Sequence, residues 1–322
     1  MWSMKYNSLN QYLRNRFGCK VYKIAINGGF TCPNRDGTIS TGGCIFCSGY
    51  GSGDFTEEAG VSVTEQIERG KNRIAGKMPK ADDYKNKNDN DIVSVVSVND
   101  AKRRKEVQGK YIAYFQSFTN TYAPVERLRE LYTEAISNSD IVAISIATRP
   151  DCIPEDVLDL LSELNGIKPV WVELGLQTIH EKTARYIRRG YELDVYDEAV
   201  KRLRERQLEV ITHVILGLPG ETREEMLDTV RYVGKSGVQG IKLQLLHVIK
   251  GTELAKDYGQ GLFECMTMDE YTDLIRDCIA ELPKDIVIHR MTGDGARKTL
   301  IAPMWSTDKK RVLNEINRKL SV

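Results

Sequence analysis

The sequence lacks an excess of charge of either sign. It has 46 Lys and Arg against 45 Asp and Glu in 322 residues, which gives a formal net charge of +1. Such a balance excludes binding of nucleic acid through a global positive field, so any RNA contact would need a local basic patch. The chain also lacks an apolar run long enough to span a bilayer. We therefore expect no membrane partner.

A secretory signal and a disulfide framework are missing as well. The N-terminal residues have no apolar core, so we expect a cytoplasmic protein. Seven cysteines cannot all pair, and free thiols are normal in that compartment. Three of the seven crowd into one glycine-rich loop while four are scattered. This asymmetry indicates a metal or redox site.

What the sequence does contain is a regular alternation of short β-branched runs and amphipathic helical stretches. The predicted strands cover residues 21–27, 111–116, 141–148, 170–176, 210–216 and 241–247. The predicted helices cover residues 63–75, 125–138, 155–164, 194–205 and 223–235. This alternation implies parallel strands with right-handed crossovers. We predict an α/β fold, a partial (β/α)6 TIM-type barrel of parallel strands with a C-terminal α/β extension; a doubly wound sheet is the alternative.

The same pattern predicts two domains. Residues 1–250 form the barrel core, and residues 78–110 within it are a polar surface insertion. Residues 251–322 form an extension that packs on the barrel mouth. Its predicted elements are a helix at 268–281, a strand at 286–290 and a basic terminal helix at 308–320.

Polar loops follow several of the predicted strands. The cysteine loop comes after the first strand, and residues 116–121, 148–151 and 217–221 come after the second, third and fifth. Because the carboxyl ends of parallel strands meet at one edge, these loops gather on one face. That face is the predicted active site.

The cysteine loop has the spacing of a metal site. Cys32, Cys44 and Cys47 are separated by eleven and then two residues. Thiolates suit zinc or iron–sulfur clusters, but zinc wants four ligands and the nearest histidine is the distant His180. An iron–sulfur cube with three thiolates has one iron open to a substrate or cofactor. The alternatives are three buried free cysteines, or a zinc knuckle with an aspartate as fourth ligand.

The loop, with Phe46 before its last cysteine, resembles that of the radical SAM superfamily, where SAM is S-adenosylmethionine. A likeness to the branch of oxygen-independent coproporphyrinogen oxidase and the Elongator catalytic subunit rests on three segments, SIATRPD at 145–151, VELGLQ at 172–177 and ILGLPGE at 215–221. The long cysteine spacing resembles the YhcC/YtqA-like group, as do YFQSFTNTYAP at 114–124 and LHVIKGT at 246–252. The resemblance covers nearly the whole chain outside 78–110.

This resemblance implies a [4Fe–4S] cluster on Cys32, Cys44 and Cys47, with SAM bound to its open iron. One-electron cleavage of SAM then gives a 5′-deoxyadenosyl radical that abstracts a substrate hydrogen. By position, Gln177 matches a residue that binds the ribose and Arg189 one that binds the SAM carboxylate. An Arg fork suits a carboxylate. The residues that would border adenine are Phe46, Leu246 and His247.

Two positions depart from the family pattern. The Gly-Gly-Glu motif that binds the SAM amino group is replaced here, so Gln116, Thr119 or Asn120 takes that contact. A ribose-binding Glu after the third strand is absent, and Thr148 or Glu173 replaces it.

The substrate residues are less defined by the sequence. The candidates for catalysis are His247, Arg290, Asp294 and Cys152, at or near strand ends. The resemblance implies a radical SAM enzyme that acts on tRNA and converts a carboxymethylaminomethyl to an aminomethyl group on the wobble uridine. Lysines and arginines of the first and terminal helices would contact phosphates. A flavodoxin or ferredoxin would supply the electron. The alternatives are a radical SAM enzyme for a small metabolite, and a non-catalytic iron–sulfur or zinc module that senses redox state.

Overall fold

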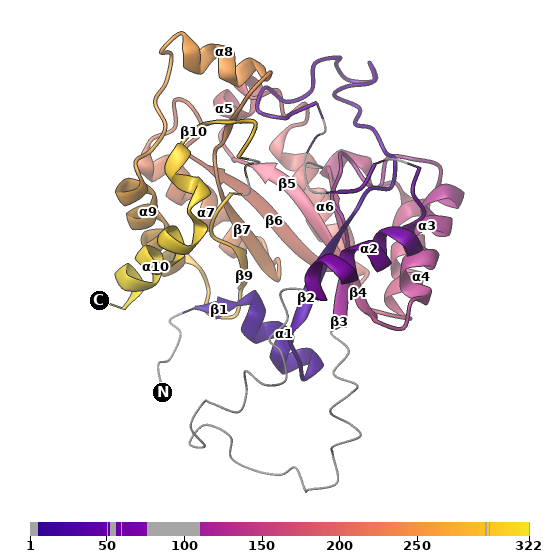
Figure 1. The fold of residues 1–322 in the computed structure, drawn as a ribbon. Helices are drawn as coiled ribbons and strands as arrows, with labels where there is room; N and C mark the ends of the chain where they lie inside the picture. Colours follow the sequence, from indigo (N-terminus) through magenta and orange to yellow (C-terminus); the bar gives the residue numbers. More distant parts are fainter. Residues whose placement is uncertain are drawn as a thin grey trace, which may run out of the picture.

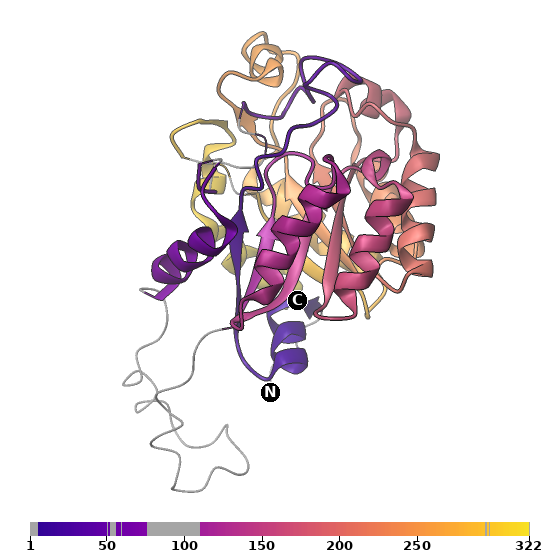
Figure 2. The same cartoon turned by 90° about the vertical axis from the view of Figure 1, so that its right-hand side faces the viewer.

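Eight strands form one curled, parallel sheet, with helices along its outer face (Figure 1, Figure 2). This computed structural model describes residues 6–49, 51, 56–58, 60–75, 110–293, 295 and 297–321. The strand order across the sheet is β1-β9-β7-β6-β5-β4-β3-β2. The bounds are β1 (Asn7–Ser8), β2 (Val21–Ile26), β3 (Lys110–Phe115), β4 (Ile141–Thr148), β5 (Val170–Gln177), β6 (Glu209–Leu216), β7 (Gly240–Leu245) and β9 (Val287–Arg290).

Most of the helices connect successive strands and bury their apolar stripes against the sheet, whereas the helix at 253–259 packs on the strand at 248–249 and the helix at 309–320 packs on the helix at 268–281. The helices are α1 (Leu9–Phe17), α2 (Val63–Ala75), α3 (Val125–Ser137), α4 (Glu155–Asn165), α5 (Glu181–Tyr186), α6 (Leu193–Glu205), α7 (Arg223–Lys235), α8 (Glu253–Gly259), α9 (Met268–Glu281) and α10 (Lys309–Leu320). Two of them, α7 and α9, begin with complete capping boxes at Thr222 and Thr267. No helix in these described residues is long and apolar enough to cross a membrane.

The structure confirms the predicted partial barrel and all six of its predicted strands. It adds β1 and β9 to the sheet, so eight strands replace the six expected. Strand β9 is the strand predicted in the C-terminal extension, and it pairs in parallel with β7. Pairing there gives the backbone groups at the open edge of β7 their hydrogen-bond partners. The division at residue 250 stays a prediction, and the 78–110 insertion, Lys110 apart, falls outside the described residues.

A second, two-stranded sheet stands at the carboxyl end of the barrel. It consists of β8 (Val248–Ile249) and β10 (Leu300–Ala302), which pair in antiparallel orientation. Strand β8 follows β7 almost directly, so this ribbon begins where the barrel strand ends. The short helix η4 (Met304–Thr307) then leads from β10 into α10.

The inner face of the barrel carries an unusual set of polar side chains. Its strands are buried on both faces, as parallel strands with outer helices usually are, and most of their residues are apolar. Side chains alternate between the two faces of a strand. Glu173 of β5, His213 of β6 and Lys242 of β7 all line the cavity on the inner face. The sheet register therefore places three ionisable groups inside the barrel.

Candidate active site

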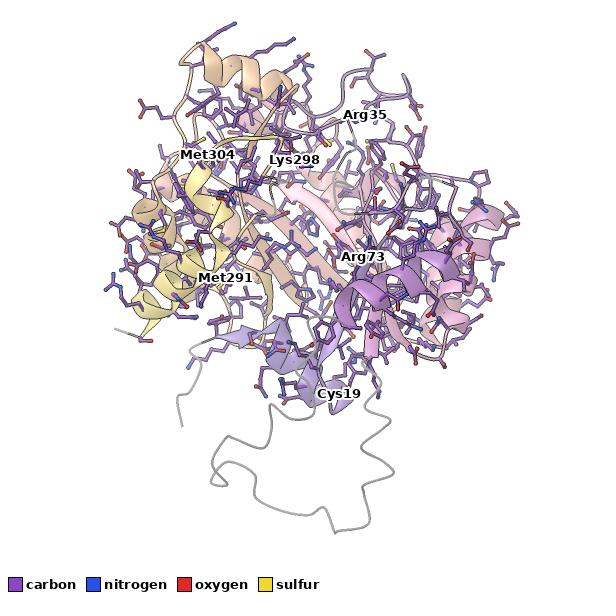
Figure 3. All side chains as sticks on the ribbon, in the orientation of Figure 1. Cys19, Arg35, Arg73, Met291, Lys298 and Met304 are labelled. Carbon is purple, nitrogen blue, oxygen red and sulfur yellow. The ribbon has the colours of Figure 1, made fainter. Side chains whose placement is uncertain are left out.

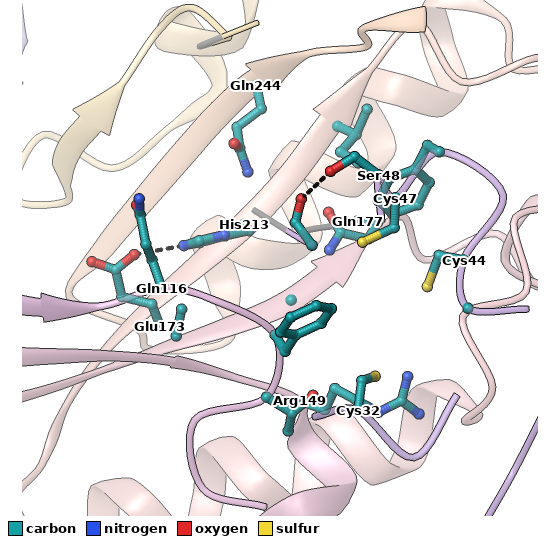
Figure 4. Close-up of a pocket in the computed structure, with 18 of the residues that line it drawn as sticks. Cys32, Cys44, Cys47, Ser48, Gln116, Arg149, Glu173, Gln177, His213 and Gln244 are labelled. Carbon is teal, nitrogen blue, oxygen red and sulfur yellow. Dashed lines mark hydrogen bonds and ion pairs between the residues drawn. The ribbon is translucent and has the colours of Figure 1, made fainter. Parts of the chain in front are cut away.

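A cavity of about 310 Å³ opens at the carboxyl ends of the strands. The cysteine loop forms one wall, the strand ends form the floor, and the β8–β10 ribbon borders the other side (Figure 4). Most of the residues predicted from the sequence line it, namely Cys32, Cys44, Phe46, Cys47, Gln116, Thr148, Glu173, Gln177, Arg189, Leu246, His247 and Arg290. The fold thus brings together residues that lie up to 258 positions apart, from Cys32 to Arg290.

Two predicted residues lie elsewhere. Asn120 is fully buried, and its amide donates to the Ala147 carbonyl at 2.7 Å. Cys152 lines a separate groove behind the cysteine loop, where its thiol lies 3.6 Å from an oxygen of Asp151. Burial raises the pKa of this thiol. Asp294 falls outside the described residues.

The cysteine loop is held to the barrel by one amide. Asn34 is buried, and its amide donates to the carbonyls of Arg188 at 2.8 Å and Arg189 at 3.1 Å. The same nitrogen lies 3.6 Å from the Cys44 sulfur. Gly190 leaves room for this contact, because a Cβ there would come within 2.5 Å of the Asn34 oxygen. The loop between α5 and α6 therefore fixes the position of the cysteines.

An arginine within the loop also orders it. The Arg35 guanidinium donates to the carbonyls of Cys47 at 2.9 Å and Ser48 at 2.6 Å. It also stacks over the Phe118 ring, 5.5 Å from the centroid. Arg35 thereby joins the end of the cysteine loop to the segment after β3. Sequence reasoning did not select this residue.

Arg189 and Arg149 form a second buried group beside the cysteines. The Arg189 side chain is 2% exposed and donates to the Tyr191 carbonyl at 2.9 Å and to Glu181 at 2.8 Å. Arg149 makes a two-pronged pair with Asp151, at 2.9 and 2.6 Å, and donates to the Arg189 carbonyl at 2.7 Å. The remaining guanidinium nitrogen of Arg189 donates to the Thr178 carbonyl at 2.7 Å, so all three guanidinium nitrogens of Arg189 are already bonded. Its contact with the SAM carboxylate stays a prediction.

Six side chains deep in the barrel form what we call the polar floor: Lys23, Tyr114, Ser145, Glu173, His213 and Lys242. The carboxylate at its centre, Glu173, is fully buried. One oxygen accepts from Lys23 at 2.7 Å and Ser145 at 2.5 Å. The other accepts from His213 at 2.7 Å and from Lys242. With four donors this carboxylate is saturated, and its predicted contact with SAM stays a prediction.

The charges of the polar floor follow from burial and from one another. Burial alone would raise the pKa of Glu173, but Lys23 and Lys242 outweigh it and hold that pKa well below its usual range. Burial, helped by the nearby Lys242 and opposed by Glu173, lowers the pKa of His213 to about 4. His213 is therefore neutral at pH 7 and donates its Nε2 hydrogen to Glu173.

Sequence reasoning missed His213 and Lys242, although a signal was present. Each is the one ionisable residue in the interior of a mostly apolar strand, EVITHVIL in β6 and GIKLQL in β7. A charged residue is almost never fully buried without a partner, so a lysine in a buried strand indicates a paired charge. The partner strand could not be named from the sequence, because the register between strands was unknown.

Two family models and three relatives place the chain. The description "Radical SAM superfamily" matches residues 34–233, and "Radical_SAM C-terminal domain" matches residues 238–321. The first model spans more than half of the chain.

The chain belongs to the radical SAM superfamily.

The relatives agree with this placement. YtqA of Bacillus subtilis is 45% identical over 98% of this chain and 89% of its own length, which confirms the likeness to the YhcC/YtqA-like group. The tRNA uridine(34) acetyltransferase of Methanocaldococcus jannaschii is 27% identical over 48% of this chain and 28% of its own. The structure of Methanocaldococcus infernus Elp3, at 16% identity, superposes with a TM-score of 0.63 over 93% of this chain and 63% of that one. This last likeness shows the fold.

As a radical SAM enzyme, the chain uses a [4Fe–4S] cluster and SAM. The three thiols of the cysteine loop fit the cluster. They line one cavity and are free thiols, yet no three His, Cys, Asp or Glu side chains among the described residues lie close enough to hold a single ion. In a cluster each thiolate binds a different iron, so the sulfurs stand apart around it. Figure 4 shows them spaced around one end of the cavity.

The second requirement of the site is a place for SAM, and Gln177 is suited to it. Its backbone has a φ of 69°, a strained conformation that β5 holds at its carboxyl end. Its side-chain oxygen is buried and has no partner among the described residues. An acceptor without a donor in a cavity wall suits a ligand hydroxyl, such as those of a ribose. The predicted role of Gln177 is therefore compatible with the site.

Proposed function

We propose that this radical SAM enzyme acts on the wobble uridine of tRNA and converts its carboxymethylaminomethyl group to an aminomethyl group. Support comes from the partial likeness to the tRNA uridine(34) acetyltransferase of Methanocaldococcus jannaschii, which acts on the same nucleoside. The observation that carries the proposal is a cavity whose wall includes the basic side chains of Arg35, Lys242 and Arg290 and one carboxylate, Glu173; Arg149 and Arg189 also line it but are paired with Asp151 and Glu181. Such a site suits an anionic substrate.

The rim of the cavity offers a local basic patch of the kind that RNA binding needs. The patch consists of exposed residues next to β8, before β10 and at the start of α10, namely Lys250, Arg297, Lys298, Lys309, Lys310 and Arg311. Figure 3 shows Lys298 at the same end of the molecule as Arg35 of the cysteine loop. Lysines and arginines in such a patch neutralise phosphates and carry most of the affinity for RNA.

Four of the predicted phosphate contacts, Arg14, Arg16, Arg318 and Lys319, are not part of this patch. Lys319 is nearly buried, and it pairs with Asp269 at 2.6 Å and Asp273 at 3.0 Å. Arg16 of α1 pairs with Glu209, the first residue of β6, at the opposite end of the sheet. The first three basic residues of α10 are the ones that remain near the cavity.

The reaction removes a two-carbon unit from the amine. A [4Fe–4S] cluster held by Cys32, Cys44 and Cys47 would supply the one-electron chemistry that cleaves SAM and would take one electron back, so that a hydrogen atom and an electron can leave the substrate. Loss of one hydrogen atom and one electron from the carboxymethyl carbon gives a C=N bond. Addition of water then breaks that carbon–nitrogen bond, releasing glyoxylate and leaving the primary amine. The rings of Phe118 and Tyr191 contribute to the cavity wall.

A gene deletion tests the function directly. Nucleoside mass spectrometry of tRNA from the deletion strain should show carboxymethylaminomethyl uridine at the expense of aminomethyl uridine and anything made from it. The wild-type gene should restore the normal pattern, and a Cys44→Ala copy should not. Wobble uridines that are the same with and without the gene would contradict the proposal.

A purified system tests the chemistry. Reconstituted enzyme, SAM, tRNA and reduced flavodoxin or ferredoxin should yield 5′-deoxyadenosine, glyoxylate and aminomethyl uridine in equal amounts. Release of 5′-deoxyadenosine without any change in the RNA would refute the tRNA substrate and favour a small metabolite.

A further inference from the structure

Gln177, the last residue of β5, is the central residue of a tight turn of the chain. Its φ is 69°, and the Thr178 amide donates to the Leu176 carbonyl at 2.9 Å across it. These are the marks of the classic γ-turn, which is rare and strained. A residue with a side chain keeps a positive φ only where its surroundings hold it there. The neighbours of Gln177 must therefore fix this turn.

The chain is held from outside on both sides of the turn. Before the turn, the Gly175 carbonyl accepts from the Tyr191 hydroxyl. After it, the Thr178 carbonyl accepts from Arg189 at 2.7 Å, and the Thr178 hydroxyl donates to Glu221 at 2.5 Å. We call Thr178, Arg189, Tyr191 and Glu221 the clamp. Its bonds reach the residues next to Gln177 and leave the Gln177 side chain free for other contacts.

The parts of the clamp come from different loops and meet in a buried place. Thr178 is fully buried and the Arg189 side chain nearly so, which protects their hydrogen bonds from competition by water. Arg189 and Tyr191 lie between α5 and α6, and Glu221 lies between β6 and α7. Glu221 ends the segment ILGLPGE and Gln177 ends the segment VELGLQ. The bond from Thr178 to Glu221 thus joins two segments that the sequence had singled out.

The turn also determines where the Gln177 amide points. A Cβ on Gly175 would come within 2.9 Å of the Gln177 amide nitrogen, so the side chain lies back over this glycine. Figure 4 shows it at the tip of β5, on the cysteine side of the cavity. Its oxygen stays in the cavity wall without a partner among the described residues. A turn relaxed to negative φ would send the side chain in another direction and remove this acceptor from the wall.

We infer that Thr178 and Glu221 are positioning residues that hold Gln177 in the strained turn and thereby set how tightly the enzyme binds SAM. In this scheme the Gln177 oxygen accepts from a ribose hydroxyl. Neither Thr178 nor Glu221 lines the cavity, so both act through Gln177. An acceptor that is fixed before binding loses little freedom when the ligand arrives, which raises affinity. The inference needs only SAM and does not depend on the tRNA substrate.

The test measures binding of SAM to holoenzyme with an oxidised cluster, by equilibrium dialysis and counted per cluster. Thr178→Val removes the hydroxyl and keeps the shape of the side chain. It should raise the Kd for SAM about 10-fold, the effect of losing one buried hydrogen bond to a charged acceptor. Thr178→Ser keeps the hydroxyl and should bind SAM nearly as the wild type does. Thr272→Val, at a buried threonine of α9 outside the cavity, is the matched control and should leave Kd unchanged.

A double-mutant cycle tests whether the effect passes through Gln177. Gln177→Ala should itself weaken binding of SAM. In that background Thr178→Val should have little further effect, because the side chain that it positions is gone. In the reduced holoenzyme, Thr178→Val should raise the KM for SAM in release of 5′-deoxyadenosine and leave kcat nearly unchanged, as expected when a binding contact is lost.

Four results would overturn the inference. Thr178→Val or Gln177→Ala could bind SAM as tightly as the wild type. Thr178→Ser could bind it as weakly as Thr178→Val, or the effects of Thr178→Val and Gln177→Ala could multiply in full. If Thr178→Val does not fold, Glu221→Ala takes its place in the same cycle, with Glu221→Gln as the conservative variant that keeps an acceptor oxygen.

Discussion

Removing the charge of Glu173 tests how the polar floor is built. In Glu173→Gln the two lysines lose their counter-charge, and two of the four hydrogen-bond donors then face an amide NH₂ in place of an oxygen. Lys242 is 3% exposed, so water cannot compensate it; Lys23 is 21% exposed and is partly screened. The perturbation is thus concentrated on the pair between Glu173 and Lys242.

The expected size follows from that burial. Breaking a buried ion pair by removing one partner costs about 3–5 kcal/mol. Unfolding entropy is about 2.1 cal/mol/K per residue, so over 322 residues this free energy lowers the melting temperature by about 4–7 °C. Replacing both partners, as in Glu173→Gln with Lys242→Met, should cost about 1–3 kcal/mol less than the sum of the single changes.

Urea unfolding of the four proteins of this cycle, at pH 7 and with a thiol reductant, measures these values. The reductant keeps the seven cysteines free. Three results would refute the reasoning. The first is a decrease in the free energy of unfolding below about 1 kcal/mol for Glu173→Gln, which is the range of an exposed salt bridge. The others are a larger decrease that is fully additive with that of Lys242→Met, and an unchanged melting temperature.

Three further predictions concern the cysteine loop and the histidines. Cys44→Ala should remove the cluster, seen as loss of bound iron and sulfide and of visible absorbance, whereas Cys19→Ala, at the opposite end of the molecule from Arg35 (Figure 3), should keep it. Gly190→Ala should lower the free energy of unfolding by about 1–3 kcal/mol, because the φ of Gly190 is 81° and the new Cβ meets the Asn34 amide that holds the cysteine loop. A variant with full iron content and an unchanged free energy of unfolding in urea would refute this. Burial lowers the pKa values of His213 and His247 to about 4, so below about pH 6.5 the unfolded chain binds more protons than the folded one. The free energy of unfolding is therefore full above that pH and falls towards pH 4 by up to about 1.4 kcal/mol per pH unit for each histidine. A free energy of unfolding in urea that stays constant over this pH range would contradict the prediction.

Local pattern was sufficient for the elements and the cysteine loop. Short β-branched runs and amphipathic helices identify themselves, because their periodicity reflects which side faces the core. The six barrel strands were therefore predicted, and so was the strand that became β9. Its place in the sheet was not, because parallel neighbours are set by the whole chain and not by adjacent residues.

The cofactor half of the site followed the sequence closely, since cysteine spacing and strand-end motifs are local features. The exceptions are instructive. Asn120 and Cys152 follow strand ends as their cavity-lining neighbours do, but Asn120 turns back to bond the Ala147 carbonyl, and Cys152 faces a groove on the other side of the loop. Which way a loop residue points depends on its hydrogen bonds, and these are tertiary.

The sequence by itself determined the class of enzyme. It contains three cysteines, one fewer than the four ligands of a closed site, on a loop after the first strand of a βα series. Only the tertiary structure decided the polar floor. Its ionisable members Lys23, Glu173, His213 and Lys242 lie on four different strands, and none of them has its partner beside it along the chain. Strand order and register bring them together inside the barrel, and burial there makes their charges depend on one another.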